Sequence, residues 1–167
     1  MVEFYTIDWT HYGDLVSDLT EAIKSSGQEF DLVIGIARGG IPVAMVIADQ
    51  LGVSVDIINV KSYIGIAKRN KPKIISTLTE NVKGKKVLVV DDLVDEGDTM
   101  ETVLSFLKKA RPAKLMTAVL FKKPWSRFDP DFCLKVVDKW VVFPWEHGEV
   151  GRIRLAMKAA PKGLSTG

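Results

Sequence analysis

The 167-residue sequence has a single cysteine, almost no net charge and no long hydrophobic run. With Cys133 alone, an intrachain disulfide and a zinc site built on several cysteines are excluded, so we expect a reducing, cytoplasmic environment. A formal charge of +2 offers no electrostatic reason to expect nucleic-acid binding. No stretch has the length of a membrane span, and the first residues lack the apolar segment of a signal peptide. We therefore expect a soluble protein with neither a nucleic-acid nor a membrane partner.

The remaining composition is that of an ordinary globular domain. Hydrophobic residues make up 47% and charged residues 26%, which is the usual balance between core and surface. A chain of this length buries roughly 70% of the surface that it exposes when unfolded, so it needs no metal or disulfide for stability. We predict one domain over residues 1–167, with residues 159–167 as a frayed tail.

Short β-branched runs alternate with amphipathic helical patterns along most of the chain. Helical patterns cover residues 10–27 and begin again at Pro42 and after Gly97, where Thr99 is the expected cap. Strands are predicted over residues 31–36, 55–60, 86–90 and 115–121. This alternation is typical of an α/β fold with an open parallel sheet and right-handed crossovers.

Two segments interrupt the alternation. Residues 61–85 contain the basic, turn-rich tract 68–73, which is too polar for a core, and we predict a flexible excursion with a short hairpin there. From residue 124 onward no strand–helix unit is evident. A set of aromatic residues nevertheless gathers in that region, comprising Trp125, Phe128, Phe132, Trp140, Phe143 and Trp145. We predict that they form a small C-terminal aromatic subdomain or lid.

Residues 89–99 carry the most informative chemistry in the chain. Asp91 and Asp92 follow an apolar β-branched run and precede a turn that contains Gly97 and then Thr99. Ligands of open α/β sheets bind beyond the carboxyl ends of the strands, and a helix N-terminus with glycine-turn amides binds phosphate. Paired carboxylates suit vicinal hydroxyls or a metal-bound sugar, so the segment predicts a phosphorylated ribose. The alternative is an ordinary turn with solvated acids, but clustered carboxylates at a sheet edge are costly unless a ligand requires them.

This segment resembles the signature of the type I phosphoribosyltransferases, which is a β-branched strand, two acids, a short loop, glycine and threonine. The resemblance extends over about residues 31–146 and implies the open parallel-sheet fold of that family. It implies that the ribose and 5′-phosphate of phosphoribosyl pyrophosphate (PRPP) are bound by Asp91, Asp92, Asp95, Glu96, Gly97, Asp98 and Thr99. It also implies that Asp95 is the general acid/base, acting at the purine N7.

A second loop supports the same resemblance. The residues that follow the strand at 31–36 are similar to the pyrophosphate loop of the family, in which backbone amides and a basic side chain receive the leaving group. This loop consists of Ala37, Arg38, Gly39 and Gly40. Relatives have a cis peptide bond in this loop, which by position joins Ala37 to Arg38. Taken alone, a Gly-Gly pair before a helix is an ordinary tight turn.

Residues 122–150 are similar to the base-binding region of the 6-oxopurine enzymes, the hypoxanthine-guanine and xanthine-guanine phosphoribosyltransferases. The resemblance implies that Lys123 binds the purine O6, with Lys122 as the alternative. It implies that Trp140 stacks on the base and that the backbone of Val141 contacts it; the alternative for Trp140 is a core position. A cation suits the exocyclic oxygen and repels the amino group of adenine.

Two further assignments rest on the resemblance. The resemblance implies a hood, which is a flexible loop over residues 61–85 that closes over the reacting centre. It implies that Lys61, Ser62 and Tyr63 form the start of this hood. A solvated basic loop is the alternative for this segment. Mg²⁺ is the implied cofactor, and its candidate ligands are Asp91, Asp92 and Glu146.

The expected reaction is transfer of ribose 5-phosphate from PRPP to N9 of guanine, hypoxanthine or xanthine, with release of pyrophosphate. Arg38 and Asp95 are the expected catalytic residues, and relatives imply a homodimer or homotetramer. One departure concerns Glu96, where relatives usually have threonine, and Asp98, where they have a neutral or basic residue. Two extra carboxylates beside a phosphate weaken its binding unless they point outward or meet local cations. An adenine-specific enzyme on the same scaffold is therefore kept as an alternative. A non-catalytic regulator that senses PRPP or a nucleotide is the alternative from another functional class.

Overall fold

The computed structural model describes residues 3–61, 64–65, 68–69, 72–146, 148 and 151. Its helices are α1 (Trp9–Ser25), α2 (Gly40–Leu51), α3 (Asp98–Lys108) and the 3-10 helix η1 (Pro144–Glu146). Its longer strands are β2 (Leu32–Ala37), β3 (Ser54–Lys61), β7 (Lys86–Val94), β8 (Lys114–Lys122) and β9 (Phe132–Val136). Its short strands are β1 (Phe4–Thr6), β4 (Ile64–Gly65), β5 (Lys68–Arg69), β6 (Lys73–Ile74) and β10 (Trp140–Val142). Two compact units are present, a larger one within Asp14–Asp138 and a smaller one within Met1–Gly13 and Lys139–Gly167.

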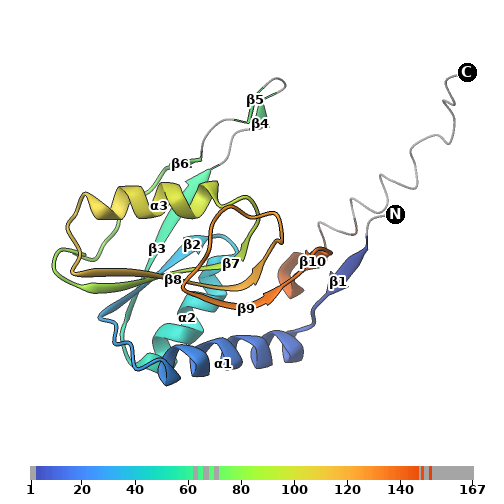
Figure 1. Cartoon of the computed structure of the whole chain (residues 1–167), viewed down its shortest axis with the longest axis horizontal. Coiled ribbons are helices and arrows are strands. Elements are labelled where there is room, and N and C mark those ends of the chain that lie inside the picture. The colour runs from blue at the N-terminus through green and yellow to red at the C-terminus, as the bar shows by residue number, and fades with distance from the viewer. Residues whose placement is uncertain are drawn as a thin grey trace, which may run out of the picture. The chain divides into compact units, whose positions relative to one another are not determined.

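The larger unit is built on a six-stranded sheet with the strand order β6-β3-β2-β7-β8-β9 (Figure 1). Neighbouring strands are parallel throughout, except that the short edge strand β6 runs antiparallel to β3. The order places β7, the strand that ends in the acidic residues, in the interior of the sheet between β2 and β8. The predicted α/β fold with an open, mainly parallel sheet is confirmed.

The two faces of this sheet are covered by different helices, α3 on one side and α2 on the other (Figure 1). Alternation along β2 explains the arrangement, because Leu32, Ile34 and Ile36 join the core cluster that contains the buried side chains of α3. The intervening Gly35 faces α2, where a Cβ built on it would lie 2.7 Å from the Cβ of Ala44. Helix α2 therefore packs directly on the backbone of β2.

Two predicted boundaries differ from the structure around the acidic segment. Strand β7 continues to Val94 instead of ending at residue 90, because β8 keeps pairing with it, Asp91 opposite Val119 and Val94 opposite Lys122. Helix α3 begins at Asp98 with Gly97 as its N-cap, and no side chain caps it. The prediction of Thr99 as the cap is wrong, since Thr99 already lies in the first turn.

Strand β9 was not predicted from the sequence. It adds to the sheet beside β8, and its start is anchored by Asp131, whose carboxylate accepts hydrogen bonds from the backbone N–H and the hydroxyl of Thr117 at 2.7 and 2.8 Å. The strand is short and mostly exposed, with two of its five side chains half-buried. A five-residue edge strand that buries so few side chains gives only a weak sequence signal.

The smaller unit joins the beginning of the chain to the segment after residue 138. Strands β1 and β10 pair in parallel there, and Trp145 stacks on Phe143 with ring centroids 4.9 Å apart. Tyr12 meets Trp145 edge-on at 5.1 Å, so helix α1 contributes to the same aromatic cluster. The predicted aromatic grouping is therefore wrong in its membership, because the remaining predicted aromatics, Trp125, Phe128 and Phe132, belong to the larger unit.

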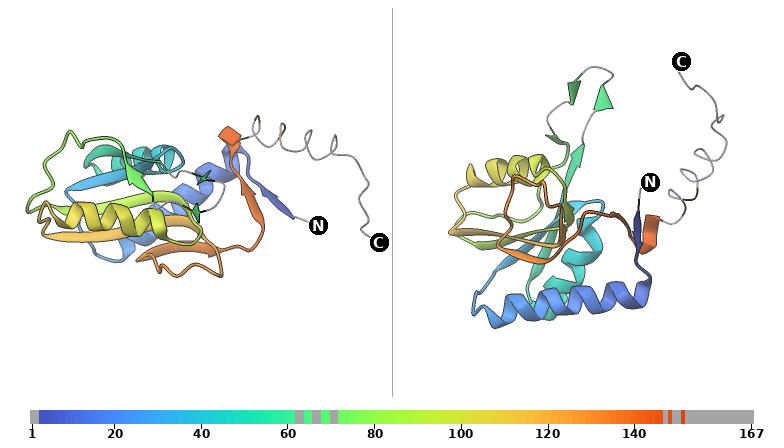
Figure 2. Two further views of the ribbon diagram at one scale, coloured as in Figure 1. Left: turned by 90° about the horizontal axis from the view of Figure 1, so that it is seen from above. Right: turned by 45° about the vertical axis from the view of Figure 1, so that its right-hand side comes forward.

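The excursion after β3 contains a short antiparallel pair, β4 with β5, which lies beyond the end of β3 (Figures 1 and 2). This pair agrees with the predicted hairpin. Farther along, the backbone N–H groups of Thr79 and Glu80 donate to the buried carboxylate of Asp56, at 2.7 and 2.8 Å, which fastens the segment to β3. Residues 62–63 and 159–167 lie outside the described residues. In the part that the structure describes, no helix has the length and hydrophobicity needed to span a bilayer.

The close packing of α2 on β2 is testable with a pair of glycine substitutions. Gly35→Ala should lower the free energy of unfolding by about 1–3 kcal/mol, because the added methyl group meets Ala44 in an interior with no room for it. Gly13→Ala in α1 is the matched control, since a Cβ built on Gly13 meets nothing within 4 Å and alanine favours a helix by up to about 1 kcal/mol. Urea unfolding of both variants is the measurement. Equal stability of the two variants would contradict the packing.

Candidate active site

Two loops meet at the carboxyl end of β7. A Cβ built on Gly39 would lie 2.0 Å from a carboxylate oxygen of Asp92, and one on Gly40 would lie 2.5 Å from the carbonyl oxygen of Val90. Neither position therefore admits a side chain unless its surroundings move. The glycine loop after β2 packs directly on the acidic end of β7, as the resemblance of these two loops requires.

The same loop contains the predicted cis peptide. The bond between Ala37 and Arg38 is cis, which confirms the prediction made from the resemblance. Ala37 is the last residue of β2, and Arg38 carries an exposed side chain. The loop thus presents a cation and backbone amides at the edge where the strands end, an arrangement suited to a phosphate-rich ligand.

The carboxylates of Asp91 and Asp92 are close neighbours in this half-buried setting. The backbone N–H of Asp92 donates to Oδ1 of Asp91 at 2.9 Å. Burial, and after it the negative charge of Asp92, raise the pKa of Asp91 well above its usual range. A pair of acids held together in this way favours hydroxyl donors or a cation beside it.

The donor set at this position fits Mg²⁺. Mg²⁺ prefers oxygen ligands and is usually held by one or two carboxylates together with substrate phosphates and water, which matches the pair Asp91 and Asp92. Within the described residues no cluster of three His, Cys, Asp or Glu side chains is positioned to hold a metal. The third predicted ligand, Glu146, belongs to the smaller unit, where its Oε2 accepts a hydrogen bond from the N–H of Phe143 at 3.1 Å.

The turn between β7 and α3 has the shape of a phosphate site. Gly97 has a left-handed backbone (φ 105°), which favours glycine. A Cβ at this position would also lie 2.4 Å from the Cβ of Phe128, so the packing requires glycine as well. The first backbone bond of α3 runs from the N–H of Glu101 to Gly97, so the N–H groups of residues 98–100, Thr99 among them, precede the bonds of the helix. Amides and a hydroxyl at a helix N-terminus are favourable for a phosphate group.

Of the two unexpected acids of this turn, Asp98 has a cation as its side-chain partner, and Glu96 is bonded to the same residue through its backbone. Oδ1 of Asp98 accepts a hydrogen bond and ion pair from the Arg127 guanidinium at 2.8 Å, and the N–H of Arg127 donates to the carbonyl of Glu96 at 3.3 Å. Both side chains of the ion pair are exposed, so its contribution to stability is about 1 kcal/mol at most. Its effect is to compensate the negative charge beside the phosphate turn. Arg127 is thus the local cation that the sequence required for Asp98. No sequence pattern had identified Arg127 as that cation.

The segment after β8 lies alongside the same turn. The N–H of Lys123 donates to the carbonyl of Val94 at 2.9 Å, and the Lys123 side chain is buried. Its ammonium lies 5.5 Å from the ring centroid of Trp125, whose indole N–H donates to Oδ1 of Asp95 at 2.7 Å. Lys122, the alternative for binding the base, forms an ion pair with Asp129 instead. Position therefore favours Lys123.

Burial and charge act in opposite directions on Lys123. Burial lowers the pKa of its ammonium, and the nearby carboxylates of Asp95 and Asp138 raise it by a smaller amount. A buried lysine with two nearby carboxylates is typical of a binding or catalytic site, whereas most lysines lie on the solvated surface. Trp125 has no motif that would have marked a site role in the sequence, whereas Asp138 flanks Trp140 in the segment 138–142 that resembles the base-binding region.

The remaining candidates divide between the two units. Trp140 has 54% of its surface exposed in the smaller unit, so it is not a core residue, while Val141 is buried and pairs with Tyr5 of β1. Lys61 is exposed at the end of β3. The other two hood residues, Ser62 and Tyr63, lie outside the described residues.

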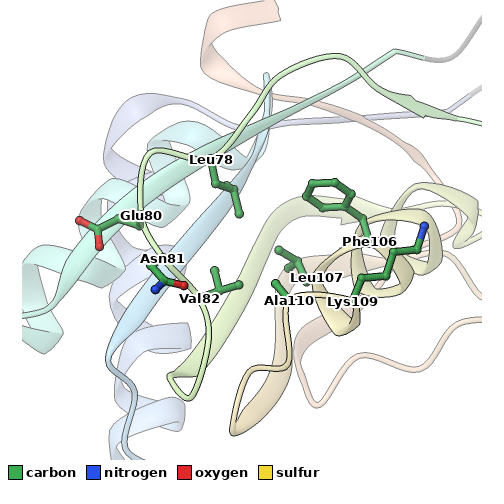
Figure 3. A pocket seen from close by; sticks show the side chains of 8 residues that line it. All are labelled: Leu78, Glu80, Asn81, Val82, Phe106, Leu107, Lys109 and Ala110. Carbon is green, nitrogen blue, oxygen red and sulfur yellow. The ribbon is translucent and has the colours of Figure 1, made fainter.

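A cavity of about 400 Å³ lies away from these groups, at the far end of α3 (Figure 3). Phe106 and Leu107 line it from the helix, and Leu78 and Val82 line it from the segment before β7. Its lining is mostly apolar and includes none of the predicted site residues. The residues that carry the chemistry instead surround the carboxyl end of β7.

Comparison with known proteins decides the family. The phosphoribosyl transferase domain matches residues 8–150. The chain belongs to this family. A xanthine-guanine phosphoribosyltransferase from Cereibacter sphaeroides is 35% identical to it over 119 residues, which cover 68% of each chain. The crystal structure of a purine phosphoribosyltransferase from Pyrococcus horikoshii is similar with a TM-score of 0.77 and 33% identity, covering 86% of this phosphoribosyltransferase and 94% of that chain.

A third relative is named as a regulator of transcription. The transcriptional regulator GfcR from Methanocaldococcus jannaschii is 29% identical over 126 residues, which cover 70% of this phosphoribosyltransferase and 58% of the regulator. The matches confirm the resemblance read from residues 37–40 and 91–99.

The charges around Lys123 predict how its pKa responds to substitution. The ammonium should titrate below the ordinary lysine value, and Asp138→Asn should lower the pKa further, because it removes a negative charge that favours the protonated form. NMR titration of the lysine side chains measures both. Lys86 is the internal comparison, since hydrogen bonding and charge from Glu29 raise its pKa. A rise of the Lys123 pKa in Asp138→Asn would contradict the assignment of these charges.

Proposed function

We propose that this phosphoribosyltransferase transfers ribose 5-phosphate from PRPP to N9 of a 6-oxopurine and releases pyrophosphate. The observation that carries the proposal is the meeting of three segments at the end of β7: the glycine loop at 37–40, the acidic turn at 91–99 and the buried Lys123 beside Asp95. The first two suit the charged sugar, and the third suits a base. The xanthine-guanine relative at 35% identity supports the same class of substrate.

PRPP is proposed to lie along the carboxyl edge of the sheet. Its 5′-phosphate accepts hydrogen bonds from the first turn of α3 and from Thr99, and its ribose hydroxyls donate to Asp91 and Asp92. The pyrophosphate lies against residues 37–40, where Arg38 supplies a positive charge. Mg²⁺ held beside the two acids supplies further charge neutralisation to the pyrophosphate.

The reaction breaks the bond between C1′ and the pyrophosphate oxygen and forms the bond between C1′ and N9. Both electrons of the broken bond leave with pyrophosphate, so C1′ becomes oxocarbenium-like while negative charge grows on the leaving group. Arg38 and the loop amides stabilise that growing charge. We propose that Asp95 is the general acid/base at the purine N7: as N9 bonds to C1′, its carboxylate accepts the N7 proton, so that the nucleotide leaves with a neutral imidazole ring.

Base choice is proposed to rest on Lys123. Its ammonium donates a hydrogen bond to an exocyclic oxygen at position 6, whereas the 6-amino group of adenine presents a donor where an acceptor is needed. The exposed ring of Trp140 is proposed to stack on the base, and the backbone of Val141 to contact its edge. We also propose that the protein is cytoplasmic and acts as a homodimer or homotetramer.

The second candidate is a regulator that binds PRPP or a nucleotide without turnover. The relationship to GfcR is the observation that favours it. An enzyme on the same scaffold that prefers adenine is the third. Nucleotide formation, measured with each purine in the presence of PRPP and Mg²⁺, distinguishes the three, since only the oxopurine enzyme converts guanine, hypoxanthine or xanthine faster than adenine.

Substitution of the two neighbouring lysines tests how the base is chosen. Lys123→Ala should lower kcat/KM for the oxopurine about 10- to 150-fold, the value of a hydrogen bond from a charged donor, and should leave the KM for PRPP unchanged. Lys122→Ala is the matched comparison, because Lys122 pairs with Asp129 and should show a much smaller loss. Steady-state kinetics with both substrates varied is the measurement. A larger loss from Lys122→Ala, or adenine as the best substrate, would overturn the assignment.

A further inference from the structure

Trp125 contacts two of the side chains to which the proposed reaction assigns chemical roles. Its indole N–H donates to Oδ1 of Asp95 at 2.7 Å. The face of its ring lies under the ammonium of Lys123, 5.5 Å from Nζ to the centroid. One side chain thus engages the proposed acid/base through its edge and the proposed base-binding cation through its face.

The position of Trp125 is not that of a core residue. Of its surface, 55% is exposed, so packing in the interior does not fix the orientation of the ring. The tight turn that carries it is closed by the N–H of Ser126, which donates to the carbonyl of Lys123 at 3.0 Å. The N–H of Lys123 in turn donates to Val94, so the turn is fastened to the strand that carries the acids. An exposed ring on a fastened turn has a defined orientation without being part of the core.

We infer that Trp125 is a positioning residue, which holds the carboxylate of Asp95 and the ammonium of Lys123 in a fixed relation to each other. The inference rests on the proposed function, because it gives Trp125 a purpose only if these two groups act on one bound purine. An N–H bond to one carboxylate oxygen restricts rotation of the Asp95 side chain. The cation–π contact restricts the long, flexible Lys123 side chain at little cost, since the ring is already oriented.

The two contacts predict two separable effects. Proton transfer requires the carboxylate within hydrogen-bond reach of the purine, and a displacement of about 1 Å is enough to slow a reaction substantially. Loss of the N–H donor should therefore reduce kcat. The ammonium binds the base, so loss of the ring face should instead weaken purine binding.

Two substitutions of Trp125 separate these effects. Trp125→Phe keeps a ring face and removes the donor, and it should lower kcat about tenfold while the KM values for purine and PRPP change less than twofold. Trp125→Gln keeps an N–H donor and removes the ring, and it should raise the KM for the purine about two- to fivefold, the value of an exposed cation–π contact. The midpoint of thermal unfolding should change little in both, because the ring is mostly exposed.

A matched control and a double mutant keep the test specific. Trp9→Phe replaces a tryptophan of similar exposure in the smaller unit and should leave kcat and both KM values unchanged. In an Asp95→Asn background, which should itself lose about 10²–10⁴ in rate, Trp125→Phe should cause no further loss, because the group that it orients is gone. A full tenfold loss in that background would overturn the positioning role, and so would a wild-type kcat in the single Trp125→Phe variant.

A spectroscopic readout separates failure of this inference from failure of the proposed function. In ¹⁵N-labelled protein the indole N–H resonance that disappears in Trp125→Phe should shift in Asp95→Asn and stay in place in Lys122→Ala. If the wild-type protein forms no nucleotide from any purine, the proposed function fails and the positioning role fails with it, whatever the resonance does. If the protein is active but the resonance does not respond to Asp95→Asn, the contact is absent and only the positioning role is overturned.

Discussion

The close contact between the glycine loop and the acidic end of β7 is the constraint on which the rest of the site depends. Gly39 lies against the carboxylate of Asp92 and Gly40 against the backbone of Val90, both at distances that exclude a Cβ. The contact is prepared by the parallel pairing of β2 with β7, which ends with Gly35 opposite Val90. Because this pairing ends just before the glycine loop on one strand and the acidic pair on the other, residues 37–40 and Asp91–Asp92 lie side by side. A side chain at Gly40 would press on the backbone of β7, and one at Gly39 would displace the carboxylate of Asp92.

The second organising feature is the alignment of residues 123–128 with residues 94–98. The pairing of Val94 with Lys122 in the β7–β8 ladder sets the register. The two loops that follow these strands stay aligned through the backbone hydrogen bonds from Lys123 to Val94 and from Arg127 to Glu96. The ion pair between Arg127 and Asp98 and the packing of Phe128 on Gly97 continue this alignment. The segment proposed to bind the base therefore cannot move far without the segment proposed to bind the phosphate. This arrangement also explains how one of the two unusual acids is tolerated there, since Arg127 in the facing loop pairs with the carboxylate of Asp98.

The sequence predicted those parts of the molecule that local patterns control. The apolar strands, the helix faces and the strand–acid–glycine–threonine segment are contiguous in the chain, so their periodicity and spacing are visible without the fold. The pairing of β1 with β10 and the addition of β9 were missed, because these short strands depend on contacts distant in sequence. Trp125 and Arg127 were missed for the same reason: neither belongs to a motif, and each matters only through a partner about 30 positions away. Thr99 was misassigned because the cap position depends on the left-handed backbone of Gly97, which starts the helix earlier than expected.

Calorimetric titration with PRPP in the presence of Mg²⁺ tests most directly whether the junction of residues 37–40 with residues 91–99 is the phosphoribosyl site. The wild-type protein should bind PRPP, and Gly39→Ala should weaken binding at least about tenfold, because the added methyl group must displace the Asp92 carboxylate. Gly13→Ala, in which the methyl group meets nothing, should bind like the wild type. Undiminished binding by a folded Gly39→Ala variant, or no binding by the wild-type protein, would contradict this assignment.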